Sequence, residues 1–298
     1  MPDFVVGPVS VTVPATSANL GPGYDTLGLA LEWRDTLTGT VLEEGLEVLV
    51  TGEGAGAVPL DETHLVVRCM RQVFDLAGGQ PAGLRLECAN VVPHARGLGS
   101  SSAAIVGGLA LARALVVGGA ELLDDTALFE LAARIEGHPD NVAPAVFGGL
   151  TISGYEDETF FSVSAPVDDR IAAVVFIPSD GVETKVARGL IPAQLSHADA
   201  AANAGRTALL IAALAGQPEQ LLRATRDYLH QEYRRPAMPA SLDLVDALRA
   251  SGTPAVVSGA GPTVLALVTS EEEALKALAL APQRWQTHRL AVSGVGVV

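Results

Sequence analysis

The sequence predicts an α+β fold with two domains. Strand-like and helix-like segments follow one another without a regular strand–helix–strand rhythm, which disfavours a doubly wound parallel sheet. The 298 residues are 49% hydrophobic and only 18% charged, enough to bury a large core. A polar, acidic stretch at 154–169, interrupted by Gly154 and Pro166, separates the two halves. We therefore expect one domain at 1–157 and another at 158–298.

Apolar periodicity predicts the elements of each half. In the first half we expect strands at 9–13, 41–50, 84–92 and 149–153, and helices at 62–76 (with Asp61 as its cap), 103–117 and 125–135. In the second half we expect strands at 171–177, 255–257, 263–268 and 290–298, and helices at 198–215, 218–230, 241–250 and 271–280.

The charge balance limits the classes of partner. The formal net charge is −15, which disfavours nucleic acid and anionic membranes as partners. An anionic ligand would need local hydrogen-bond donors and a divalent cation. Cys69 and Cys88 are the only cysteines, and we expect buried free thiols. Without a signal-peptide pattern or a long apolar run, the sequence predicts a cytoplasmic protein.

Residues 93–104 are the most informative stretch, because a strand leads through a glycine- and serine-rich turn into a helix. Such a turn presents backbone N–H groups and the positive end of the helix dipole to an anion, most often phosphate. It is neither a Walker A loop, since no lysine follows it, nor a dinucleotide Gly-x-Gly-x-x-Gly turn. The alternative is a strand-to-helix turn that binds nothing.

Two polar clusters could complete a site around this loop. In 14–25, Asn19 and Asp25 could present an amide and a carboxylate to a small polar ligand, or could only stabilise the turn. In 136–144, Glu136 offers a hard oxygen ligand for Mg²⁺, and Asp140 and His138 offer proton acceptors. The alternative there is a helix C-terminus with ordinary turn chemistry.

The second half adds a basic cluster and another glycine turn. Arginine forks bind carboxylate and phosphate in a bidentate manner, although surface arginines are usually only solvated. The turn at 258–263 could line a ligand cavity where no side chain would fit, or could be a simple hairpin. The basic residues are Lys185, Arg188, Arg206, Arg234 and Arg235.

Together these clusters resemble the motifs of the GHMP kinase superfamily. The three superfamily motifs match 14–25, 93–104 and 258–263, in the same order and across nearly the whole chain. Within the superfamily, 15–25, 136–145, 184–194 and Tyr233-Arg234 are most similar to the homoserine kinases.

The resemblance implies an N-terminal domain like ribosomal protein S5 domain 2, a ferredoxin-like C-terminal domain, and ATP in the cleft between them. It also implies transfer of the ATP γ-phosphoryl group to the side-chain hydroxyl of L-homoserine, a step toward threonine, by a homodimer.

The same resemblance assigns expected roles to individual residues. ATP would contact Pro93, Arg96, Gly97, Leu98, Gly99, Ser100, Ser101, Ser102, Ala103 and His64, the last at a position where relatives often carry asparagine. Mg²⁺ would be held by Ser101 and Glu136. Homoserine would be held by Asn19, Asp25, His138, Arg188 and Arg234. Asp140 and Asn141 would lie at the reacting hydroxyl, and Asp140 is a candidate base.

Two other functions remain open from the sequence. One is a sister GHMP kinase acting on mevalonate, a sugar or shikimate. The other is a GHMP-fold protein that binds ligands without catalysis, which the presence of Gly97, Gly99, Ser101 and Glu136 disfavours.

Overall fold

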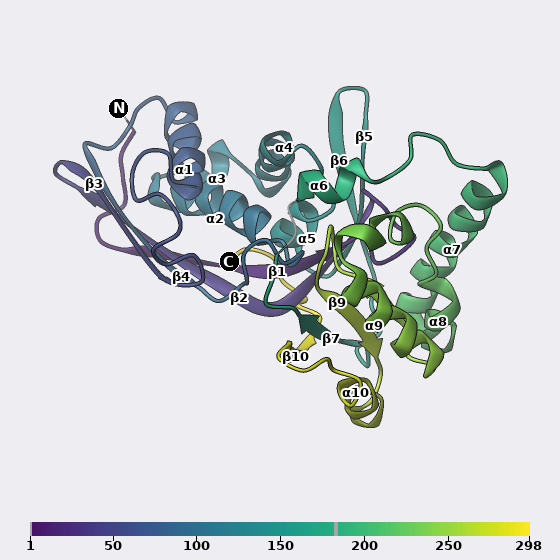
Figure 1. The fold of residues 1–298 in the computed structure, drawn as a ribbon. Helices are drawn as coiled ribbons and strands as arrows, with labels where there is room; N and C mark the ends of the chain where they lie inside the picture. The colour runs from purple at the N-terminus through teal and green to yellow at the C-terminus, as the bar shows by residue number, and fades with distance from the viewer. Residues whose placement is uncertain (1, 182–183) are drawn as a thin grey trace.

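Two β-sheets form the framework of the protein, and helices cover them (Figure 1). The structure is a computed structural model, and it describes residues 2–181 and 184–298. In this part of the chain the first sheet has six strands, with β3-β4-β2-β5-β6 in order and β1 paired to β2. The second sheet has four strands in the order β10-β7-β9-β8.

The strands are β1 (Val9–Ala18), β2 (Leu27–Leu42), β3 (Gly45–Gly52), β4 (Gly83–Asn90), β5 (Leu150–Glu156), β6 (Thr159–Ala165), β7 (Ala172–Ile177), β8 (Ala255–Val257), β9 (Val264–Val268) and β10 (Gln286–Ala291). The α-helices are α1 (Leu65–Leu76), α2 (Ser100–Leu115), α3 (Gly119–Leu122), α4 (Asp125–Glu136), α5 (Val142–Phe147), α6 (Thr184–Gly189), α7 (His197–Gly216), α8 (Leu221–Ala224), α9 (Pro239–Ala250) and α10 (Glu271–Leu278). Short 3₁₀ turns lie at η1 (Pro218–Gln220) and η2 (Glu232–Ala237).

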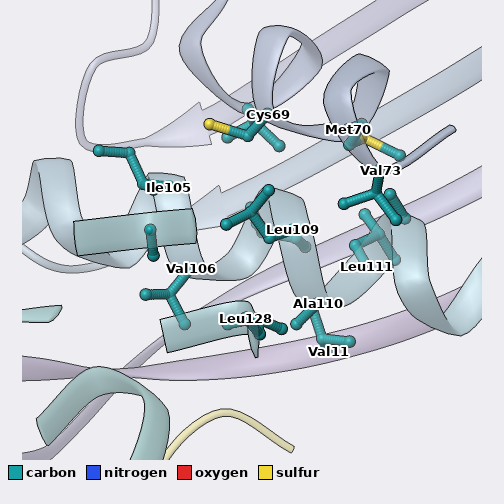
Figure 2. Packing of buried hydrophobic residues seen from close by; sticks show 14 of the residues in the cluster. Val11, Cys69, Met70, Val73, Ile105, Val106, Leu109, Ala110, Leu111 and Leu128 are labelled. Carbon is teal, nitrogen blue, oxygen red and sulfur yellow. The ribbon is translucent and has the colours of Figure 1, made fainter. Parts of the chain in front are cut away.

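Helix α2 is the centre of the first domain. Its residues are small or apolar on nearly every side, which is typical of a helix that is buried all round. Helices α1 and α4 pack against it, and together they cover one face of the first sheet. Leu109, Met70 and Val73 meet between α1 and α2 (Figure 2). This packing fixes the start of α2, where the glycine- and serine-rich turn ends.

A central core joins the two sheets. Leu29 of β2, Val175 of β7 and Leu265 of β9 are fully buried in one apolar cluster. Alternate residues of β7 point to opposite faces, as expected of a strand. Phe176 therefore packs into a separate outer core with Leu248 of α9. Because residues of both sheets pack together in the central core, this core fixes the position of one domain relative to the other.

Most of the expected elements are confirmed, but two in the first half differ in detail. The strand expected at 41–50 is interrupted rather than continuous, because a turn at Glu43 and Glu44 separates the end of β2 at Leu42 from β3, which begins at Gly45. Helix α1 begins at Leu65 rather than 62. Asp61 does not cap this helix, because its carboxylate accepts hydrogen bonds from the N–H and hydroxyl of Thr63.

Two expectations in the second half also need correction. The helix expected at 218–230 ends at Ala224, because the Asp227 carboxylate accepts hydrogen bonds from three following backbone N–H groups and forms a turn. The last strand is β10, which is earlier than the expected 290–298. Beyond it the chain returns to the first sheet, where Thr12 and Val298 exchange two backbone hydrogen bonds.

The domain limits 1–157 and 158–298 remain a prediction. Residues 157 and 158 form the tight turn of the β5–β6 hairpin, and both strands belong to the first sheet. The polar composition of 154–169 therefore reflects an exposed hairpin, and a division by sheets falls after Ala165.

The predicted free thiols are confirmed. Cys69 and Cys88 are both buried and unbonded, and burial raises the pKa of each thiol to about 12. None of the helices in the described ranges has the length and apolar character needed to cross a membrane.

Packing around α2 predicts a large stability cost for Leu109→Ala. Leu109 is fully buried, so we expect its truncation to lower the free energy of unfolding by about 2–5 kcal/mol. Chemical denaturation measures this change. Leu275→Ala is the matched control, because Leu275 on α10 is 59% exposed. We expect that control to stay within about 0.5 kcal/mol of the parent protein; equal losses in both variants would contradict the packing described here.

Candidate active site

The glycine- and serine-rich turn forms the open N-terminus of α2. Gly99 adopts a left-handed conformation (φ 72°) as the residue before the helix, and no side chain caps the first turn. The first N–H groups of a helix have no partner within it, so they point toward any anion placed there. A Cβ atom on Gly99 would lie 1.9 Å from the Thr16 hydroxyl oxygen. Glycine is therefore required both for the backbone conformation and for close packing.

The glycine turn of the second domain packs directly on this loop. A Cβ atom on Gly97 would lie 2.3 Å from the Ser258 carbonyl oxygen. The Ser258 hydroxyl donates a hydrogen bond to the Gly97 carbonyl at 2.6 Å, and Gly259 N–H donates to the Ala18 carbonyl. The three motif segments, far apart in sequence, thus meet at one place.

A cavity of about 430 Å³ opens where these segments meet. Both domains contribute to its wall, and most of its lining residues were candidates from the sequence. They are Ala18, Asn19, Ala95, Gly97, Gly99, Ser100, Ser101, Glu136, His138, Asp140, Asn141, Arg188, Arg234, Gly259 and Ala260.

Glu136 and the first serines of α2 form the acidic side of the cavity. The hydroxyls of Ser101 and Ser102 donate hydrogen bonds to Glu136 Oε1 at 2.6 and 3.1 Å. No group of three or more His, Cys, Asp or Glu residues suited to a metal occurs in the described part of the chain. Mg²⁺ does not require such a group, because it commonly binds one or two carboxylates together with substrate phosphates. Ser101 and Glu136 therefore fit this ion.

His138 and Asp140 form a hydrogen-bonded pair, with Nδ1 and Oδ1 2.8 Å apart. Burial alone would lower the pKa of His138, but the hydrogen bond and negative charge of Asp140 outweigh it and raise that pKa above its ordinary value. Asn141 is held differently, because its Oδ1 accepts a hydrogen bond from the Thr16 hydroxyl at 2.9 Å. This leaves the Asn141 amide nitrogen as the group free to face the cavity.

Arg188 of α6 meets the first domain through an ion pair. Its guanidinium donates to both carboxylate oxygens of Asp25, at 2.7 and 3.1 Å, and to the Tyr24 hydroxyl at 3.1 Å. The left-handed backbone at Asp25 is held by the Asn19 side chain, which accepts from Asp25 N–H. The Asn19 amide nitrogen donates to the Gly259 carbonyl. Asn19 therefore ties the first motif to the last.

Arg234 is a buried cation at the base of the cavity, only 1% exposed. It donates to His230 Nδ1 at 3.0 Å and to the Gly259 carbonyl at 3.1 Å. His230 must then carry its proton on Nε2, which donates to the Gly21 carbonyl at 2.8 Å. Burial lowers the pKa of His230, as expected for a neutral imidazole. Arg234 Nε has no partner among the described residues.

A second, apolar pocket of about 300 Å³ adjoins the cavity and shares Ser100 and Ser101 with it. His64 and Asp35 supply polar atoms to its wall. His64 Nδ1 is buried without a hydrogen-bond partner in the described chain, and burial lowers the pKa of this imidazole. Burial raises the pKa of Asp35, although its carboxylate accepts hydrogen bonds from two backbone N–H groups.

Some candidate residues lie outside both pockets. The Arg96 guanidinium donates to the carbonyls of Pro178, His94 and Ser179 and so braces the loop. The Leu98 side chain belongs to the central core. Pro93 lines neither pocket, and Arg235 pairs with acidic residues of η2 and α9. None of these four residues lines the cavity or the apolar pocket.

Several residues of the site escaped the sequence analysis. Tyr24 packs beneath two cations, since the guanidinium carbons of Arg188 and Arg234 each lie 5.6 Å from its ring centre. Thr16 joins the loop to Asn141, and His230 positions Arg234. Tyr24 and Thr16 stood inside a recognised motif and could have been singled out there. His230 carried only its four-residue spacing from Arg234 as a signal.

Comparison with known proteins identifies the family of the chain. A family model described as GHMP kinases N terminal domain matches residues 64–149, and one described as GHMP kinases C terminal matches 209–285. A homoserine kinase from Streptomyces avermitilis is 54% identical over 295 residues, covering 99% of this chain and 96% of the relative. One from Clavibacter michiganensis is 48% identical, covering 97% and 92%.

Solved structures show the same fold. A homoserine kinase from Cytophaga hutchinsonii superposes with a TM-score of 0.84 at 26% identity, covering 98% of this chain and 96% of that one. A putative homoserine kinase from Listeria monocytogenes superposes with a TM-score of 0.76 at 31% identity, covering 98% of this chain and 98% of that one. The structure of L. major mevalonate kinase is 16% identical in sequence and superposes with a TM-score of 0.71, so it shares the fold. With its two-domain α+β architecture and shared cavity, the chain belongs to the homoserine kinase family of the GHMP kinases.

Proposed function

We propose that this protein transfers the γ-phosphoryl group of ATP to the side-chain hydroxyl of L-homoserine, giving O-phospho-L-homoserine for threonine synthesis. One observation carries the proposal: a single cavity joins the open N-terminus of α2 to Arg188, which is paired with Asp25. The first suits a triphosphate, and the second suits an amino-acid zwitterion.

Homoserine carries a carboxylate and an ammonium group. Arg188 and Arg234 supply guanidinium groups for the carboxylate, and Asp25 supplies a carboxylate for the ammonium. In the structure, Arg188 and Asp25 form an ion pair with one another. A bound zwitterion can replace this ion pair with two others, in which its carboxylate pairs with Arg188 and its ammonium group pairs with Asp25. The net charge of the site does not change. Asn19 and His138 complete this end of the cavity in the proposal.

ATP is proposed to extend from the cavity into the apolar pocket. The loop around Gly97, Gly99 and Ser100–Ser102 would contact the triphosphate, and Ala103 and His64 would face the adenine ring. The unpartnered His64 Nδ1 can accept a hydrogen bond from a purine amino group. Pro93, Arg96 and Leu98 act through the shape of the loop.

Mg²⁺ is proposed to bind between Ser101 and Glu136, where it would neutralise phosphate charge during transfer. Glu136 is already held in place by two serine hydroxyls. This arrangement keeps a carboxylate beside the helix N-terminus without a buried, unpaired charge.

Phosphoryl transfer depends mainly on positioning and charge stabilisation, because its transition state is loose. The Asp140 carboxylate, which is hydrogen-bonded to His138, is proposed to orient the homoserine hydroxyl. It is also the candidate base that would accept the proton of this hydroxyl. Asn141 cannot serve as a base, because an amide does not ionise and its oxygen already accepts from Thr16. Its amide nitrogen can donate to an oxygen of the reacting group.

The alternative is a sister GHMP kinase with another acceptor. The Arg188–Asp25 pair favours an amino acid over mevalonate or a sugar, since neither carries an ammonium group. We further propose that the enzyme works as a cytoplasmic homodimer. The two buried cysteines are free thiols, which is typical of proteins in the reducing cytoplasm, and this supports the proposed location.

A coupled assay of ADP release tests the proposed reaction. With Mg²⁺ and ATP, we expect turnover with L-homoserine and little with mevalonate, galactose or shikimate, because only homoserine matches the charge pair. Turnover with one of the other acceptors and none with homoserine would overturn the proposal in favour of that sister kinase.

Replacement of Glu136 tests the magnesium site. We expect Glu136→Gln to lower kcat/KM by at least about a hundredfold, because loss of a metal ligand should exceed the 10–100-fold cost of losing a supporting contact. Circular dichroism should show an intact fold. Glu121→Gln on exposed α3 removes the same charge and should retain full activity. Normal turnover in Glu136→Gln would remove Glu136 from the site.

Titration of His138 tests the pair with Asp140. In the parent protein the raised pKa keeps the imidazolium protonated until the pH passes above its ordinary value. We expect Asp140→Asn to lower that pKa, because the negative charge that outweighs burial would be removed. NMR of the His138 ring protons measures it. Asp168→Asn, which removes a carboxylate from the distant pair with Arg170, should leave it unchanged. An unaltered pKa in Asp140→Asn would contradict the pairing.

A further inference from the structure

A third hollow, the arginine pocket, lies in the second domain away from the cavity described above. Its volume is about 480 Å³. Four arginines line it together with one carboxylate, so its side chains carry a net positive charge in a chain of net charge −15. The lining residues are Arg206 of α7, Glu219, Gln220, Leu222 and Arg223 of η1 and α8, Arg226, and Arg249 of α9.

The arginines of this pocket differ from most others in the protein. With 34 acidic and 19 basic residues, a carboxylate partner should be easy to find. Arginines that have one are Arg71, Arg85, Arg113, Arg134, Arg170, Arg188, Arg235 and Arg289. By contrast, Arg206, Arg223 and Arg226 make no ion pair with any residue in the described ranges. Three like charges are thus gathered without an ion-pair partner, and Glu219 is the single carboxylate in the lining.

One of these cations is built into the wall. The Arg249 guanidinium donates to the Thr225 hydroxyl at 2.8 Å and to the carbonyls of Leu222 and Ala255. Burial, together with the charge of Arg226, lowers the pKa of Arg249. A fixed, half-buried cation beside a second cation is electrostatically unfavourable, and an anion between them would relieve the repulsion.

Residues beside the arginine pocket also contact the segment 21–25 of the first motif. Asn203 and Thr207, which flank Arg206 on α7, both donate to the Pro22 carbonyl. Thr225, which accepts from Arg249, lies against Gly21, where a Cβ atom would come within 2.7 Å of its carbonyl oxygen. The arginines therefore stand directly behind the segment that carries Asp25.

We propose that the arginine pocket is a second anion site, which takes a small molecule bearing at least two phosphate or carboxylate groups. Guanidinium forks suit both groups, and several forks in one hollow favour a multiply charged ligand over a single chloride or acetate. The proposal does not depend on the proposed reaction, because it concerns residues outside the cavity.

Isothermal titration with pyrophosphate, in metal-free buffer of low ionic strength, tests the site. We expect the parent protein to bind it, and Arg223→Gln/Arg226→Gln to lose one site per chain or to bind there at least about tenfold more weakly. Both side chains are exposed, so the fold should survive. Arg68→Gln/Arg284→Gln removes two exposed arginines elsewhere and should bind as the parent does. Any pyrophosphate taken up by the main cavity contributes equally to all three proteins.

A parallel titration with citrate identifies the ligand class. Tighter binding of pyrophosphate assigns the site to phosphates, and tighter binding of citrate assigns it to polycarboxylates. Equal titrations in all three proteins would overturn the proposal. A change in molar mass of Arg223→Gln/Arg226→Gln by light scattering, with no anion bound by the parent, would also overturn it, because the pocket would then be a protein interface.

Discussion

The site depends on the close contact between two glycine turns, one from each domain. Gly97 lies against the backbone of Ser258 with no room for a side chain. Because the central core beneath them contains residues of both sheets, this contact is held rigidly. The open end of α2 therefore faces Arg188 and Arg234 across a short span. Without this contact, the glycine- and serine-rich turn and the arginines would belong to separate surfaces.

The positive charges of the cavity are supported in two different ways. A chain of net charge −15 repels anions at long range, so any attraction of an anion depends on cations held close to it. Arg234 is held by a neutral histidine and a backbone carbonyl rather than by a carboxylate. Its positive charge is therefore not neutralised by its supports. Arg188 is paired with Asp25, and that pair is itself the complement of a zwitterion.

Sequence patterns predicted most strands and helices, because burial on one or both faces imposes a clear period. Strand β6 and most of β2 lay outside the predicted segments, and other errors occurred where local chemistry competed with that period. Asp227 ended a helix by accepting three backbone hydrogen bonds, and two glutamates formed a turn inside an apolar run. β10 was placed too late, because it is an edge strand whose residues are largely polar.

The sequence alone determined the α+β class, the phosphate-type turn and most of the residues that line the cavity, since these follow from short motifs and local periodicity. Only the tertiary structure decided which side chains face the cavity. It turned Arg96 and Leu98 away from the cavity, bound Asn141 to Thr16, and placed His230 behind Arg234. The bond between Asn141 and Thr16, for example, joins residues 125 positions apart in the chain. The geometry of such contacts depends on how the two sheets share a core, which no local pattern encodes.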